Sequence, residues 1–148
     1  MVRITKSRKG IGELLMDQSV VAGVGNVYRC EVLHRLAVDP FTPGRELDPT
    51  TWQQIWQDLA LLMPLGRTFS QIITMPDQVA AASRARRSGR TREITRRLTG
   101  ERLGDTFERR FLVYKRTGEA CPRCGALVRN AQVSGRTLYW CPACQVRH

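Results

Sequence analysis

The chain has 148 residues, which is enough for one ordinary domain or two small ones. Apolar residues make up 42% of it, which excludes a wholly disordered chain, and no apolar run is long enough to span a bilayer. The opening sequence MVRITKSRKG lacks the apolar core of a signal peptide. We therefore expect a soluble, cytoplasmic monomer with no membrane partner.

The charge balance points to a polyanionic partner. Lys and Arg number 24 against 13 Asp and Glu, a net charge of +11, and most of the basic residues are arginine. Such an excess favours nucleic acid or an anionic membrane, and no basic amphipathic helix with bulky membrane anchors is evident. The guanidinium fork also matches phosphate geometry. On composition alone, a ribosomal-type or merely solubilising charge excess is the alternative.

The first third of the chain predicts two helices separated by a glycine-rich turn. KGIGELLMD, residues 9–17, has apolar residues on one helical face, and NVYRCEVLHRLA predicts a second helix over residues 26–37. Between them, Gly23 and Gly25 permit positive φ and close backbone approach. A dinucleotide fingerprint is disfavoured, because the preceding segment is not strand-like and Tyr28 occupies the third glycine position.

The next helix has a clear start. Asp48 is a good N-cap, and Pro49 fits the first helical position, where its missing N–H costs nothing. We expect Pro64 and Gly66 to close or kink this helix, and a further short helix to cover residues 69–82. The predicted core face consists of Trp52, Ile55, Trp56 and Leu59.

From residue 83 the sequence becomes strongly basic and poor in apolar residues. Residues 83–116 hold 12 basic and 4 acidic side chains, and the opening SRARRSGRTREITRRLTG predicts a weakly ordered linker. We therefore expect three parts: a helical module (residues 1–82), a basic linker (83–109) and a small cysteine-rich β module (110–148).

The cysteines give the strongest chemical signal. CPRC and CPAC are two Cys-x-x-Cys pairs with 16 residues between them, the spacing of a four-thiolate zinc site. The intervening ALVRNAQVSGRTLYW predicts two short strands joined at Ser134-Gly135, so the site would be a zinc ribbon. Four thiolates leave no open position for water, which makes the zinc structural; an iron–sulfur site or redox pairs are the alternatives. The predicted ligands are Cys121, Cys124, Cys141 and Cys144.

Four further side chains are candidates or false leads. Asn26 lies at the start of the second helix, where exposed N–H groups attract phosphate; the alternative is a simple N-cap. Arg136 follows Gly135 past the hairpin turn and is either a phosphate contact or a solvated charge. Cys30 is expected to be a buried thiol on an apolar face. His34 has no evident Cys or Glu partner and is expected to be an ordinary helix residue.

Two motifs carry a family resemblance. LLMDQSVVAGVGNVYRCEVLHRLAVDP resembles the helix–two-turn–helix of the formamidopyrimidine-DNA glycosylase / endonuclease VIII family, and GEACPRCG with GRTLYWCPACQ resembles its zinc finger. The resemblance implies a mainly α-helical module with a helix–two-turn–helix, followed by a small β zinc-ribbon module. It also implies that Asn26, Arg136 and the turn glycines Gly23 and Gly25 contact DNA. Glu31 matches a glutamate usually found in the second helix.

The same resemblance implies a role in base-excision repair. Such enzymes flip an oxidised base out of duplex DNA, and the amine of an N-terminal proline, followed by glutamate, forms a Schiff base with the sugar. This chain begins Met1-Val2-Arg3. The resemblance therefore implies that the chain is the C-terminal half, or a truncated relative, of such a glycosylase/AP lyase. The chain would bind damaged double-stranded DNA without catalysing the reaction, and a separate or missing domain would supply the catalysis. The motif sequences are more similar to the endonuclease VIII branch of the family, which implies oxidised pyrimidines as the excised bases. The alternative is a non-catalytic nucleic-acid adaptor, such as a ribosome- or RNA-associated zinc-ribbon protein.

Overall fold

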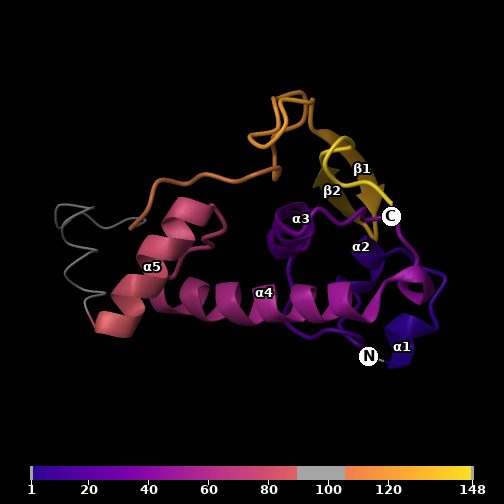
Figure 1. Ribbon diagram of the computed structural model, residues 1–148, viewed down its shortest axis with the longest axis horizontal. Coiled ribbons are helices and arrows are strands. Elements are labelled where there is room, and N and C mark those ends of the chain that lie inside the picture. Colours follow the sequence, from indigo (N-terminus) through magenta and orange to yellow (C-terminus); the bar gives the residue numbers. More distant parts are fainter. Residues whose placement is uncertain (1, 90–105, 148) are drawn as a thin grey trace. The chain divides into compact units, whose positions relative to one another are not determined.

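The computed structural model describes residues 2–89 and 106–147 (Figure 1). Within these ranges a series of helices is followed by a two-stranded antiparallel sheet, as predicted. None of the described helices is both long and apolar enough to cross a membrane. In chain order the elements are α1 (Val2–Thr5), α2 (Ile11–Leu14), α3 (Asn26–Arg35), the 3-10 helix η1 (Gly44–Glu46), α4 (Pro49–Phe69), α5 (Pro76–Ser88), β1 (Arg129–Val133) and β2 (Arg136–Trp140).

The chain divides into two compact units. Unit 1 combines Met1–Gln57 with Leu112–His148, and unit 2 is Asp58–Phe111. The segment that carries the glycine turn and the segment that carries the paired cysteines therefore belong to the same unit. The three-part organisation stays a prediction, because residues 90–105 of the predicted linker lie outside the described residues.

The predicted helices around the glycine turn differ in length. α2 has only four residues, because its N-cap, Gly10, is extended and the residues from Leu15 to Gly23 form mostly turns. α3 begins at Asn26, as expected, and ends at Arg35. Its end is fixed locally, since Ala37 takes a left-handed φ of 56° before the proline-containing segment.

α4 begins at Pro49 as predicted but runs through Pro64 to Phe69, so the proline does not end it. Burial after the proline explains the continuation, because Leu62, Leu65 and Phe69 are all buried. The expectation that Trp56 belongs to the core face is wrong: its side chain is 56% exposed, whereas Trp52 is 9% exposed. The buried stripe follows the three- and four-residue steps of the helix and leaves Trp56 to one side: Trp52, Ile55, Leu59, Leu62, Leu65 and Phe69.

The helix expected over residues 69–82 is instead α5, Pro76–Ser88. It starts at a proline in the first turn and stops at Gly89, which has φ 69°. Residues 83–88, assigned from composition to a weakly ordered linker, are therefore helical. Small apolar side chains explain why, because Val79, Ala82 and Ala85 form a buried stripe that a charge count overlooks.

The hairpin prediction is confirmed. Val133 pairs with Arg136, and Ser134 (φ 56°) and Gly135 (φ 71°) form the two-residue turn that matches strand twist. One face of the hairpin packs against α3 (Figure 1). The shared core of this part of unit 1 comprises Cys30, Val113, Cys121, Val128, Leu138 and Cys141.

A buried carboxylate fastens α3 to the segment that leads into the cysteines. Glu31 is fully buried, and its Oε1 accepts the N–H of Leu112 at 2.7 Å. Its Oε2 accepts the N–H of Val113 at 2.8 Å and, more weakly, that of Tyr114 at 3.4 Å. These bonds give Glu31 a structural role, because its oxygens are committed to backbone donors.

Replacing the Glu31 carboxylate is expected to destabilise unit 1. In Glu31→Gln, an amide N–H group meets backbone donors and leaves them unpaired, so the free energy of unfolding should fall by about 2–4 kcal/mol. Urea unfolding of the zinc-loaded chain measures this. Glu119→Gln is the matched control, since Glu119 forms an exposed pair with Arg116 and should change stability by less than about 1 kcal/mol. Equal losses in the two variants would contradict the role assigned to Glu31.

Candidate zinc centre and nucleic-acid interface

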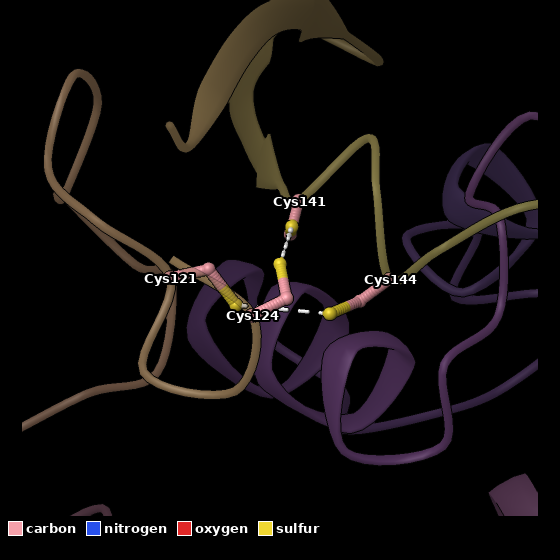
Figure 2. Close-up of side chains that lie close together, drawn as sticks. All are labelled: Cys121, Cys124, Cys141 and Cys144. Carbon is pink, nitrogen blue, oxygen red and sulfur yellow. Dashed lines mark hydrogen bonds between the residues drawn. The ribbon is translucent and has the colours of Figure 1, made fainter. Parts of the chain in front are cut away.

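The four paired cysteines converge on one point. Their Sγ atoms all lie within 4.8 Å of one another, and Figure 2 shows the side chains pointing inward from the two ends of the hairpin segment. Two of the separations are 3.8 Å (Cys121 to Cys144) and 3.5 Å (Cys124 to Cys141). A tetrahedral zinc with Zn–S bonds of about 2.3 Å places its sulfurs about 3.8 Å apart, so the arrangement fits one zinc ion.

Each Cys-x-x-Cys knuckle is a hydrogen-bonded turn. In the first, the N–H of Gly125 donates to the carbonyl of Cys121 at 2.8 Å. In the second, the N–H of Cys141 donates to Oε1 of Gln145 at 2.8 Å, and the amide of Gln145 donates to the carbonyl of Val38. Burial and the neighbouring thiols raise the pKa of Cys144 to about 12. Four thiolates at these separations would repel one another, and a zinc ion between them would supply the balancing positive charge.

α3 contributes a contact to this centre that the sequence did not reveal. His34 is fully buried, and its Nε2 lies 3.2 Å from Sγ of Cys121. The expectation that His34 has no Cys partner is therefore wrong; the two residues are 87 positions apart, so no local spacing announces the pair. Burial, followed by the charges of Arg123 and Arg116, lowers the pKa of His34 to about 4.

Asn26 lies at the other end of α3. Gly25 is the N-cap and no side chain caps the helix, so Asn26 is not the simple N-cap of the alternative interpretation. Its Nδ2 donates to the carbonyl of Thr137 in β2 at 2.8 Å, and its Oδ1 accepts from both Nε and Nη2 of Arg29. An amide nitrogen carries two N–H groups. Among residues 2–89 and 106–147, the second one on Asn26 has no partner.

Arg29 is the buried residue that joins these elements. In addition to its bonds with Asn26, Arg29 donates from Nη1 to the carbonyl of Gly12 in α2 (3.2 Å) and to that of Val133 in β1 (3.1 Å). Burial lowers its pKa, the neighbouring Cys30 opposes that shift, and the charge of Arg136 adds to it. Within the described residues no carboxylate pairs with Arg29, so its charge is balanced only by dipoles. Sequence patterns did not single out this residue.

The other predicted DNA contacts are Arg136, Gly23 and Gly25. Arg136 is exposed and immediately precedes Thr137, whose carbonyl Asn26 binds. Gly23 has φ 84°, a conformation that favours glycine, and its N–H donates to Oε1 of Gln18. A Cβ atom at Gly25 would meet no atom within 4 Å, so space is open before the N-terminus of α3. Asn26 thus adjoins the Arg136 hairpin and the two glycines precede it in the turn, whereas Cys121 contacts the other end of α3 through His34.

Together, a glycine turn leading into α3 and a four-cysteine hairpin define a zinc-finger protein of the nucleic-acid-binding class. The family model for the formamidopyrimidine-DNA glycosylase H2TH domain matches residues 1–74, and the model for the zinc finger found in FPG and IleRS matches residues 118–146. The chain belongs to the formamidopyrimidine-DNA glycosylase / endonuclease VIII family. This confirms both the family resemblance and the structural zinc.

Relatives and solved structures agree with the assignment. The chain is 40% identical to Endonuclease 8 1 of Mycobacterium tuberculosis over 143 residues, covering 97% of this chain and 47% of that protein. It is 35% identical to the formamidopyrimidine-DNA glycosylase of Geotalea daltonii, covering 91% and 42%. Lactococcus lactis Fpg in complex with abasic-site DNA has a TM-score of 0.69 and 25% identity, covering 99% and 46%. The chain spans about half the length of the relatives it matches.

Removing one zinc ligand should release the metal. Cys124→Ser is expected to lower the zinc content well below one ion per chain, because a neutral hydroxyl replaces a thiolate ligand. Metal analysis of the purified chain, with amide NMR spectra of residues 112–147, measures the loss of ion and structure. Cys30→Ala is the matched control: Cys30 is a buried thiol outside the four-sulfur cluster, and the variant should keep its zinc. Loss of zinc from the control alone would overturn the ligand assignment.

Proposed function

We propose that this chain binds double-stranded DNA at an abasic or oxidised-base lesion, as the DNA-binding half of a base-excision glycosylase/AP lyase. The observation that carries the proposal is the cluster at the start of α3. There an amide N–H of Asn26, the buried guanidinium of Arg29 and the exposed guanidinium of Arg136 meet without a carboxylate partner among the described residues. An anion is the ligand that balances such a cluster.

A backbone phosphate suits this cluster better than a base edge. The side-chain amide of Asn26 and the guanidinium groups of Arg29 and Arg136 donate hydrogen bonds, and so do the exposed backbone N–H groups at a helix N-terminus. The dipole of α3 adds partial positive charge at the same end. The open space in front of Gly25 lets a phosphate approach the first turn. Such contacts fix the register of a protein on DNA and do not read its sequence. We therefore assign Asn26, Arg136, Gly23 and Gly25 to phosphate binding and leave base selection to other parts of the enzyme.

The relatives support a DNA lesion as the partner. Lactococcus lactis Fpg, which shares the fold over 99% of this chain, is described in complex with DNA that contains an abasic site. Duplex DNA is the polyanion that also fits the +11 charge of this chain. The proposed place of action is the cytoplasm, associated with the nucleoid in a bacterial cell.

In this proposal the chain supplies binding, and the attacking amine comes from elsewhere. The reaction implied by the family uses an N-terminal proline amine followed by glutamate, and this chain spans about half the length of the relatives it matches. Glu31 does not replace that glutamate, because its carboxylate is held by the backbone of residues 112–114. We assign the 148 residues no catalytic side chain, and propose that a separate or preceding domain provides the Schiff base.

Binding should depend on the two predicted phosphate contacts. Arg136→Gln is expected to weaken binding to a duplex with an abasic-site analogue by about tenfold or more, since it removes a charge-assisted hydrogen bond. It should also reduce the salt slope of log K by about one. Asn26→Asp keeps an acceptor for Arg29 but opposes phosphate with a carboxylate, and should weaken binding at least as much. Fluorescence anisotropy at salt concentrations of about 50 to 200 mM measures both effects, because binding dominated by phosphate contacts weakens steeply over this range.

Arg45→Gln is the matched control for net charge, because Arg45 is an exposed arginine of the same unit whose guanidinium pairs with the neighbouring Glu46. It should retain nearly full affinity. Binding that ignores salt, or equal weakening by Arg45→Gln and Arg136→Gln, would refute the phosphate site. A preference for structured RNA over the lesion duplex would favour the adaptor alternative instead.

The chain alone should not form a Schiff base. Incubation with abasic DNA and borohydride is expected to trap no covalent adduct, because Lys6 and Lys9 are not positioned by any described contact opposite a flipped sugar. Denaturing gel electrophoresis detects an adduct, and a full-length relative of the family serves as the positive control. A trapped adduct would show that an amine of this chain is the nucleophile and would contradict the assignment of chemistry to another domain.

A further inference from the structure

The C-terminal end of α3 and the first cysteine knuckle are bound to each other through reciprocal contacts. From the helix, His34 reaches Cys121, with Nε2 to Sγ at 3.2 Å. From the knuckle, Arg123 reaches back to the helix: Nη1 donates to the carbonyl of His34 at 2.8 Å and Nη2 to that of Arg35 at 3.2 Å. The arginine thus satisfies carbonyl groups at the helix C-terminus, where a positive charge is favoured.

The proton on the His34 ring can be placed from its surroundings. A zinc-bound cysteine is a thiolate and has no proton to donate, so a close nitrogen–sulfur contact requires the donor to be the imidazole. Nδ1 is buried and has no partner among the described residues. An N–H there would be an unsatisfied donor, so the proton belongs on Nε2. The backbone N–H of Arg123, whose nitrogen lies 3.4 Å from the same sulfur, is a second donor to Cys121.

We propose that His34 is a positioning residue of the zinc centre, whose Nε2–H donates a hydrogen bond to the Cys121 thiolate and couples zinc retention to α3. Donors to a thiolate disperse its charge and fix the orientation of its side chain, which stabilises the metal-bound form. Because Asn26 at the other end of α3 binds the hairpin, the helix holds the finger at two places about 12 Å apart along its axis.

The first test is direct. In zinc-loaded wild-type chain, two-bond nitrogen–proton NMR correlations of the His34 ring report which nitrogen carries the proton. Protonation of Nε2 with a bare Nδ1 is expected. The Nδ1–H tautomer would overturn the proposal, and this result does not depend on whether any variant folds.

The second test separates the hydrogen bond from packing. His34→Phe keeps an aromatic ring but removes the donor, and zinc affinity measured by competition with a chromophoric chelator should fall by about 10- to 100-fold. His34→Gln, whose amide nitrogen can occupy the place of Nε2, should recover much of that loss. Val32→Ala is the matched control: Val32 is fully buried on the same helix, and the variant lowers stability without removing a donor to sulfur.

The zinc affinities of the His34 and Val32 variants are compared at an equal loss in the free energy of unfolding. His34→Phe is expected to bind zinc more weakly than Val32→Ala, and His34→Gln to have a zinc affinity close to that of the wild type. If His34→Phe retains zinc as well as Val32→Ala, or if His34→Gln gives no recovery, the contact is packing alone and the proposal fails.

Discussion

The structure of unit 1 depends on buried polar side chains of one helix that bind the backbone and a sulfur of a segment about a hundred residues away. Along α3, Asn26, Arg29 and Glu31 bind the backbone of β2, β1 and residues 112–114, in that order. His34 then meets Cys121. A buried polar group without a partner is strongly destabilising, so these contacts allow α3 and the finger only one relative arrangement.

Zinc and these contacts support each other. The hairpin with its knuckles is too small to hold a core of its own, so the ion supplies much of its folding free energy. The side chains of α3 then give the finger a fixed position, and the apolar cluster around Cys30 and Leu138 fills the space between them. The proposed phosphate site depends on this arrangement, because Asn26 comes from α3 and Arg136 from the hairpin, and the hydrogen bond from Asn26 to the Thr137 carbonyl joins the two parts.

Local signals in the sequence predicted the elements whose causes are local. The cysteine spacing, the Ser134-Gly135 turn and the proline at the start of α4 each act through a few neighbouring residues, and all three are found in the structure. Trp56 was misplaced because a four-residue step from Trp52 fits either side of a helical stripe until the packing partners are known. The Arg29–Val133 and His34–Cys121 contacts could not be predicted, since they span 104 and 87 residues and leave no periodic trace in the sequence.

The central claim is that α3 and the zinc hairpin form one surface for a DNA phosphate. NMR titration of the isotope-labelled chain with an abasic-site duplex tests it most directly, with the side-chain amide of Asn26 and the Nε–H of Arg136 as reporters. The account predicts that both resonances shift together and saturate at the same DNA concentration. Unchanged reporters, with shifts confined to the arginines of α5, would contradict it.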